Sequence, residues 1–215
     1  TSGGDAPGMN AAIRAVVRAA VFHGIEVTGV FQGYEGLITG DLTRLHARSV
    51  AKILGRGGTI LKSARCQDFY EPGGRAKGAE VLRNGNIDAL VVIGGNGTFT
   101  GAMKLAEEHG VRVVGIPGTI DNDLAGTDYT IGYDTATNTV VEAVDKIRDT
   151  ASSHNRLFFV EVMGRDSGYI ALKTGIAAGA IAVMTPEAGM DIDDLIGILE
   201  RGEAVSYTHL RAHET

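Results

Sequence analysis

Residues 88–123 constrain the fold most, because they have the pattern of a strand, a glycine-rich loop, a helix, a second strand and an acidic loop. Asp88 to Ile93 and Val111 to Ile116 are short, apolar and rich in β-branched residues, which is typical of buried strands. Phe99 to His109, between them, has helical spacing. Two strands joined in this way form a right-handed βαβ unit whose strands end at the same edge of a parallel sheet. The pattern therefore predicts an α/β protein with a Rossmann-like parallel sheet flanked by helices.

The run Gly94-Gly95-Asn96-Gly97-Thr98 follows the first of these strands. Glycines let successive backbone N–H groups point inward at a phosphate, and Thr98 can add its hydroxyl. The run lacks the Lys-Ser/Thr ending of a P-loop and the six-residue glycine spacing of the dinucleotide fingerprint. A tight strand-to-helix turn is the alternative, but a second polar loop at the same edge favours a ligand site.

The second strand leads into Pro117-Gly118-Thr119-Ile120-Asp121-Asn122-Asp123. One hydroxyl and two carboxylates at alternate positions can face one side of an extended loop. One carboxylate there can take a proton while the other faces a cation. For an isolated Asp-Asn-Asp, a polar turn with helix-capping side chains is the plainer interpretation. We expect this loop and Gly94–Thr98 to share one ligand, because they end on the same edge.

The rest of the chain continues the alternation of helices and strands. Residues 1–10 form another glycine-rich loop that opens a helix, an arrangement suited to an anion, and a strand would normally feed such a loop. The other predicted helices are Ala11–Phe22, Val50–Leu54, Ala76–Arg83, Tyr133–Ile147, Gly168–Ala177 and Asp191–Glu200, and the other predicted strands are Glu26–Phe31, Leu157–Val162 and Ile181–Met184. Residues 206–215 show no strand period, so we interpret residues 204–215 as a non-native tail.

Composition excludes several classes of protein. The 215 residues are 44% hydrophobic, which fits one large or two small globular domains. The net charge of −6 argues against nonspecific nucleic-acid binding, and no apolar run reaches the roughly 20 residues that a membrane helix needs. The single cysteine, Cys66, cannot form an intrachain disulfide and fits a reducing compartment. We expect a cytoplasmic protein that binds neither nucleic acid nor membrane.

Four runs together resemble the bacterial ATP-dependent 6-phosphofructokinases: Ser2–Gly8, Gly94–Thr98, Pro117–Asp123 and Met163-Gly164-Arg165. The resemblance extends from Thr1 to about Glu200. It implies transfer of the ATP γ-phosphoryl group to the 1-hydroxyl of fructose 6-phosphate, with Mg²⁺, by an allosteric homotetramer of two-domain subunits.

It also implies a nucleotide-binding domain at residues 1–131 and the start of a sugar-phosphate-binding domain at 132–203. The family's last third is not found here, so we expect an incomplete chain. Several core strands would lack neighbours, and as written the chain should be poorly stable and nearly inactive.

The resemblance implies a role for each matching residue. Asp121 matches the catalytic base, Asp123 a carboxylate that assists near the metal, and Thr119 a contact of the substrate and the transferred phosphoryl group. Asn96 and Asp123 match the Mg²⁺ ligands. The remaining matches are Gly3, Arg65, Cys66, Gly95, Asn96, Gly97 and Thr98 for ATP; Ile120, Arg156, Met163, Gly164 and Arg165 for the sugar phosphate; and Arg14, Arg18, Arg56, Arg148 and Gly179 for an ADP or phosphoenolpyruvate effector.

Physical chemistry qualifies several of these roles. A second carboxylate raises the pKa of Asp121, and Mg²⁺ would oppose that shift. Arg14 and Arg18 lie four residues apart on one helix, so a solvated basic face explains them equally well. Arg65 and Arg165 could form surface ion pairs, although bidentate phosphate contact is a stronger use of a guanidinium.

Four positions bear on where the chain stands within the family: two depart from the usual residue, and two distinguish ATP-using from pyrophosphate-using members. ATP-type relatives usually carry Asp where this chain has Asn96; the amide keeps an oxygen ligand but loses the charge, so Mg²⁺ binding and catalysis should weaken. Gly97 and Gly118 resemble the ATP-using rather than the pyrophosphate-using members. Ile181 replaces a glutamate found in many regulated relatives. The alternatives are a kinase of the NAD or lipid type and a non-catalytic nucleotide- or effector-binding subunit.

Overall fold

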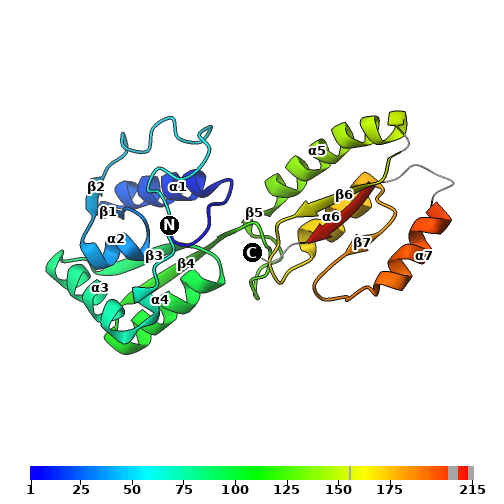
Figure 1. The fold of residues 1–215 in the computed structure, drawn as a ribbon. Coiled ribbons are helices and arrows are strands. Elements are labelled where there is room, and N and C mark those ends of the chain that lie inside the picture. Colours follow the sequence, from blue (N-terminus) through cyan, green and yellow to red (C-terminus); the bar gives the residue numbers. More distant parts are fainter. Residues whose placement is uncertain (155, 203–207, 213–215) are drawn as a thin grey trace. The chain divides into compact units, whose positions relative to one another are not determined.

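The computed structural model describes residues 1–154, 156–202 and 208–212 of the chain. Backbone contacts divide it into two compact units. The first consists of Thr1–Thr119 with Leu124–Thr127, and the second of Ile120–Asp123 with Asp128–Thr215. Both units combine helices with short strands, as the sequence predicted for an α/β protein (Figure 1).

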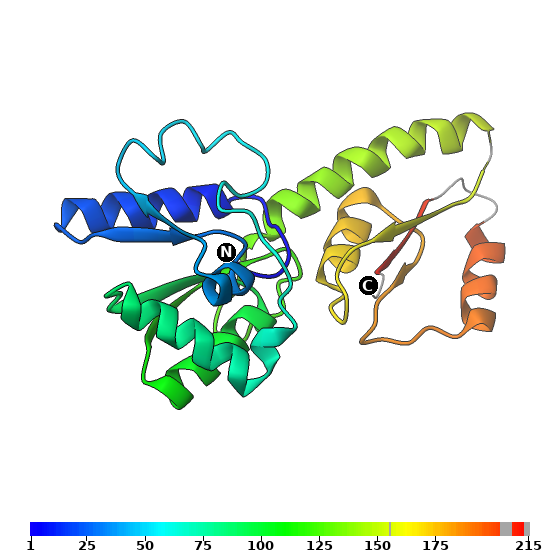
Figure 2. The ribbon, with the colours of Figure 1, turned by 60° about the vertical axis from the view of Figure 1, so that its left-hand side comes forward.

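The first unit is built around two parallel strands. Its elements are α1 (Met9–Phe22), β1 (Val27–Val30), α2 (Tyr34–Thr39), β2 (Leu42–Leu45), the 3-10 helix η1 (Asp68–Tyr70), α3 (Pro72–Asn84), β3 (Ala89–Gly94), α4 (Asn96–His109) and β4 (Arg112–Thr119). Strands β3 and β4 pair in parallel, in a register that runs from Ala89 opposite Arg112 to Gly94 opposite Pro117. Helices α3 and α4 cover one side of this pair, and α1 lies on the other (Figures 1 and 2). The predicted βαβ unit is confirmed.

Residues 34–65 differ from the expectation. Helix α2 and strand β2 were not predicted, and β2 pairs with β1 antiparallel, with Val27 opposite Leu45. The predicted helix at Val50–Leu54 is wrong. Isolated turns occupy that segment, with Ala51 N bonded to Arg48 O and Arg56 N bonded to Ile53 O. A five-residue apolar patch is too short to sustain a helix without support from packing.

The core of the first unit lies between β3 and the helices that cover it. Tyr34 and Phe69 stack with their ring centroids 3.8 Å apart. Leu37, Leu82 and Leu105 are almost fully buried beside them. The buried guanidinium of Arg75 donates to both carboxylate oxygens of Glu108 and to the carbonyl oxygens of Phe69 and Tyr70, so it fastens α3 to α4 and η1.

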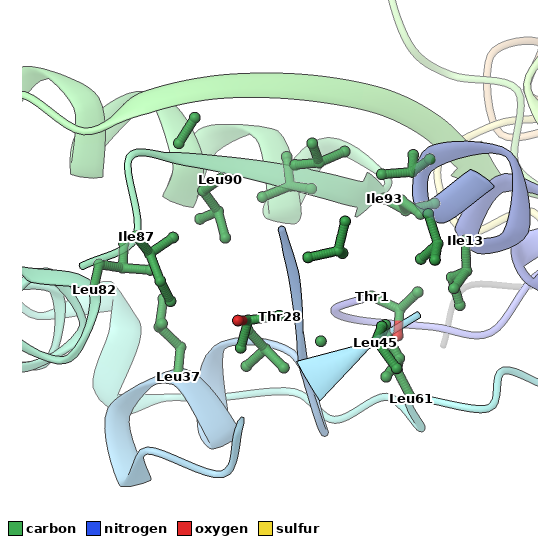
Figure 3. A pocket seen from close by; sticks show the side chains of 18 of the residues that line it. Thr1, Ile13, Thr28, Leu37, Leu45, Leu61, Leu82, Ile87, Leu90 and Ile93 are labelled. Atoms are coloured by element: carbon green, nitrogen blue, oxygen red, sulfur yellow. The ribbon is translucent and has the colours of Figure 1, made fainter. Parts of the chain in front are cut away.

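An apolar cavity of about 650 Å³ lies between β3 and β1. Residues of α1, β1 and β3 surround it, and side chains such as Ile13, Thr28, Leu45, Leu90 and Ile93 line it (Figure 3). Among the described residues, β1 pairs with β2 and β3 belongs to a different sheet. The cavity therefore lies between two strands that do not pair with each other.

The second unit has a three-stranded parallel sheet with the strand order β6-β8-β7. Its elements are β5 (Ile131–Gly132), α5 (Tyr133–His154), β6 (Phe158–Val162), α6 (Tyr169–Ala178), β7 (Val183–Met184), α7 (Ile192–Gly202) and β8 (Thr208–Ala212). Tyr133, Val144, Val162 and Ile170 form its core. No helix in the described part of the chain combines the length and apolar character needed to cross a bilayer.

Strand β8 corrects the expectation that residues 206–215 contain no strand. The residue types of Thr208–Ala212 do not alternate as a strand's residues usually do. The strand is held instead by backbone pairing with β6 on one side and β7 on the other. A strand between two partners can form with weak intrinsic preference. The rest of the interpreted tail, residues 204–207 and 213–215, lies outside the described residues.

Candidate active site

The glycine-rich run forms a turn with almost no loop. Gly94 ends β3, Gly95 precedes α4, and the helix begins at Asn96. A Cβ atom on Gly94 would lie 2.3 Å from Thr98 Oγ1 and 2.9 Å from Ser2 O, so the chain can pass here only without a side chain. The buried Thr98 hydroxyl donates to Ser2 O at 3.0 Å. Its proton is therefore used within the unit, and the contact of Thr98 with a phosphate stays a prediction.

The first turn of α4 presents backbone amides at the end of β3. Phe99 N makes the first helical bond, to Gly95 O at 3.1 Å, and Asn96 and Gly97 are exposed ahead of it. A Cβ on Gly95 would lie 3.4 Å from Thr119 Cβ, so this turn adjoins the last residue of β4. The N-terminus of a helix favours an anion, and here it lies beside the strand that leads into the acidic loop.

The first glycine loop meets this turn within the same unit. Gly3 has a positive φ of 84°, its N–H donates to Ala64 O, and its carbonyl accepts from Ser63 Oγ. A Cβ on Gly3 would lie 3.7 Å from Thr98 Oγ1. The two glycine-rich runs and the segment before Arg65 thus adjoin one another.

Arg65 and Cys66, the next two predicted ATP contacts, differ in exposure. The Arg65 side chain is exposed, whereas Cys66 packs in the core beside Phe69. Burial, together with the nearby Glu35, raises the pKa of the Cys66 thiol to about 11. Any nucleotide contact of Cys66 would therefore fall to its backbone.

The acidic loop begins after Thr119, since Pro117, Gly118 and Thr119 still belong to β4. Asp121 is half-buried and Asp123 is exposed. Burial is the largest cause that raises the pKa of Asp121; the charge of Asp123 adds to it, Arg165 opposes it, and Asp166 adds a little more. The predicted effect of the second carboxylate is present, but desolvation exceeds it.

Two residues that hold this loop were missed in the sequence. Asn122 has a φ of 53°, and its side-chain amide bonds to the backbone of Asp128 and Thr130. The buried Ser167 hydroxyl donates to Asp121 O at 2.7 Å. A signal for Asn122 existed, because Asn tolerates positive φ and bonds to nearby backbone. No local signal marks Ser167, whose partner is 46 residues away.

The predicted sugar-phosphate residues lie in the second unit. Met163 and Arg165 are exposed in the turn after β6, where Ser167 N donates to Gly164 O at 2.9 Å. Arg165 is close enough to Asp121 for its charge to lower the pKa of that carboxyl. Arg156 is exposed just before β6, and Ile120 packs against the core of this unit.

The predicted effector residues fall into two groups. Arg14, Arg18 and Arg56 belong to the first unit, and the guanidinium of Arg14 donates to Val50 O at 2.6 Å. In the second unit a Cβ on Gly179 would lie 3.8 Å from Arg148 Nη2. Arg14 and Arg18 therefore do not form a simple solvated basic face, because Arg14 is half-buried and holds a backbone carbonyl.

The oxygen atoms of Asn96 and Asp123 are of the kind that binds a metal ion whose other ligands are phosphate oxygens. No group of three or more His, Cys, Asp or Glu side chains in the described residues could hold a metal ion. Asn96 and Asp123 are exposed oxygen donors. Mg²⁺ characteristically takes one or two carboxylates and completes its shell with substrate phosphates and water, so each of these side chains, taken by itself, offers the kind of oxygen that Mg²⁺ uses.

The α/β fold and the glycine turn beside the end of β4, the strand that leads into the acidic loop, are features of the phosphoryl-transfer type of protein. The chain belongs to the phosphofructokinase family, whose sequence profile matches residues 1–210.

Curated relatives and solved structures agree with this assignment. The chain is 57% identical over 209 residues to the ATP-dependent 6-phosphofructokinase of Halalkalibacterium halodurans, covering 97% of the chain and 65% of that protein. It is 56% identical over 202 residues to ATP-dependent 6-phosphofructokinase 2 of Bacteroides thetaiotaomicron, covering 94% of the chain and 62% of the relative. The Pichia pastoris phosphofructokinase structure in the T-state superposes with a TM-score of 0.89 at 41% identity, covering 99% of the chain and 25% of that chain. The chain thus spans less than two thirds of the length of these curated relatives.

Proposed function

We propose that this chain supplies the nucleotide site, the base and part of the sugar-phosphate site of an ATP-dependent 6-phosphofructokinase. The reaction transfers the γ-phosphoryl group of ATP to the 1-hydroxyl of fructose 6-phosphate, giving fructose 1,6-bisphosphate. The observation that carries the proposal is the half-buried Asp121, two residues after β4, the strand whose last residue adjoins the glycine turn. The 57% identity to a relative named for this activity supports it.

The first unit holds the nucleotide in this proposal. The amides at the start of α4 and the loop around Gly3 bind phosphate oxygens, and the exposed Arg65 adds a positive charge. Gly97 is exposed at the turn, where a larger side chain would crowd a triphosphate. The name ATP-dependent, which both curated relatives carry, supports ATP over pyrophosphate as the donor.

The second unit supplies the base. Phosphoryl transfer depends mostly on positioning and charge neutralisation, so one base, a cation and an arginine suffice. Burial raises the pKa of Asp121, which makes its carboxylate more basic toward the 1-hydroxyl proton. Thr119 contacts the transferred group, and Ile120, Met163, Gly164, Arg165 and Arg156 bind the sugar phosphate, with Arg156 reaching that of a neighbouring subunit. Asn96 and Asp123 would each offer an oxygen to Mg²⁺, which would supply neutralisation of phosphate charge when bound.

The remaining assignments are part of the same proposal. Residues 1–131 form the nucleotide-binding domain, and residues 132–203 begin the sugar-phosphate-binding domain. The whole protein is a cytoplasmic, allosteric homotetramer of glycolysis. Arg14, Arg18, Arg56, Arg148 and Gly179 form its effector site; the first three belong to the first unit and the other two to the second.

A substrate panel tests the proposal. The chain is incubated with [γ-³²P]ATP and Mg²⁺ and with fructose 6-phosphate, NAD or diacylglycerol, and calorimetry measures ATP binding in parallel. Label in fructose 1,6-bisphosphate above the enzyme-free blank, at a low rate and lost in Asp121→Asn, is the expected result. Label in NAD or lipid would favour the other kinase classes, whereas ATP binding without turnover of any substrate by a full-length version would favour a nucleotide-binding subunit.

A further inference from the structure

The backbone on both sides of Asp121 is held by side chains that the proposed reaction does not use. Asn122 follows it with a φ of 53°, in the left-handed region. Its Oδ1 accepts the N–H of Thr130 at 2.8 Å and lies 3.3 Å from the Thr130 hydroxyl, while its Nδ2 donates to Asp128 O at 3.1 Å. One side chain thus ties the acidic loop to the segment that leads into β5 and α5.

Ser167 holds the same loop from another element. Its hydroxyl donates to Asp121 O at 2.7 Å, and its own N–H donates to Gly164 O at 2.9 Å. Only 5% of Ser167 is exposed, so water competes little for these bonds. The carbonyl of the base is therefore tied to the turn that carries Met163, Gly164 and Arg165.

We propose that Asn122 and Ser167 are positioning residues, which fix the acidic loop so that Asp121 is held in register with the sugar-phosphate turn. The inference rests on the proposed function, because it assigns Asp121 to the base. A small displacement of a catalytic group lowers kcat strongly, since reacting atoms must be held within a few tenths of an ångström. Asn122 is suited to the task because it accepts positive φ at low cost and offers a donor and an acceptor on one amide.

Substitutions at Asn122 separate the effect of its side-chain hydrogen bonds from the effect of its positive φ. Asn122→Gly keeps the left-handed backbone accessible but removes both side-chain bonds, whereas Asn122→Ala removes the bonds and adds backbone strain. The matched control is Asn86→Gly, the same exchange at another residue of positive φ, 50°, which is exposed between α3 and β3. For Ser167→Ala the matched control is Ser153→Ala, which removes a 2.8 Å bond from a serine hydroxyl to the carbonyl of Asp149 on the exposed face of α5.

Kinetics with ATP and fructose 6-phosphate supply the first readout. We expect Asn122→Gly and Ser167→Ala to lower kcat by about tenfold to a hundredfold with little change in the KM for ATP, and Ser167→Thr to recover part of the loss. Asn86→Gly and Ser153→Ala should keep kcat unchanged. Equal kcat for Asn122→Gly and the unmodified chain would overturn the inference and leave the proposed function intact.

Amide hydrogen exchange, followed by NMR, supplies a readout that needs no activity. The Thr130 amide should exchange at least about tenfold faster in Asn122→Gly than in Asn86→Gly, because its acceptor is gone. Should the unmodified chain fail to phosphorylate fructose 6-phosphate, the proposed function fails and exchange alone decides whether the loop is held. Unchanged Thr130 exchange would contradict the positioning role in either case.

Discussion

The glycine turn after β3 and the acidic loop after β4 follow neighbouring parallel strands but are held by different means. The turn is shaped by backbone packing, and a Cβ on Gly94 would collide with Thr98 and Ser2. The loop is shaped by side-chain hydrogen bonds from Asn122 and Ser167. A phosphate cradle needs backbone amides that nothing covers, whereas a general base needs one carboxylate in a fixed place. We therefore expect substitutions in the turn to act through steric clashes and substitutions in the loop to act by displacing Asp121.

The largest effect should come from the loop. Asp121→Asn removes the proposed base while keeping shape and burial, and should lower kcat by about a thousandfold. Its melting temperature should fall little or even rise, because the burial that raises the pKa of the carboxyl also disfavours its charge. Coupled assays and circular dichroism melts measure both quantities, with the exposed Asp128→Asn as control. Retention of more than about a tenth of the activity would remove Asp121 from the role of base.

The turn is tested by adding one methyl group at adjacent positions. Gly94→Ala should lower the free energy of unfolding by about 1–3 kcal/mol, because its Cβ would lie 2.3 Å from Thr98 Oγ1. Gly95→Ala is the matched control, since its Cβ would meet Thr119 at 3.4 Å, an ordinary contact distance. Urea unfolding measures both. Equal stability of the two variants would show that the turn is not closely packed.

A third variant introduces into the glycine turn a carboxylate, the group that characterises the acidic loop. Asn96→Asp places a carboxylate at the exposed first residue of α4, where a hard cation is bound better by charge and where an acid also suits the helix dipole. We expect tighter Mg²⁺ binding or a higher turnover, by a few-fold, in assays at graded Mg²⁺ concentrations. An unchanged rate and Mg²⁺ dependence would refute a metal role for this position.

The smallest effect concerns the apolar cavity between β1 and β3, where the side chains are not closely packed. Thr28 lines the apolar cavity (Figure 3), so Thr28→Val should raise the free energy of unfolding by up to about 1 kcal/mol. Thr43→Val makes the same change at a half-buried residue of β2 outside the cavity, and so measures the effect of the exchange without the cavity. Destabilisation by Thr28→Val in thermal melts would show that the cavity is filled by water that the hydroxyl binds.

The sequence pattern predicted an element correctly where the residues of that element alone indicate its secondary structure. The β3-α4-β4 unit follows from two β-branched runs around a helical period, and the structure moves the predicted start of α4 only from Phe99 to Asn96. Pattern failed for β2 and β8, because pairing with other strands, and not apolar alternation, holds them. It also gave no sign that the Thr98 hydroxyl bonds to Ser2 O or that Cys66 packs in the core.

The sequence alone determined the class of fold, the order of strands and loops around Asp121 and the resemblance that placed the chain in its family, because these depend on residue types at short spacing. Tertiary structure alone decided which polar atoms are already occupied. Ser167 reaches Asp121 across 46 residues, and Arg14 holds Val50 across 36. Such bonds depend on how distant segments pack, and no local pattern encodes that distance.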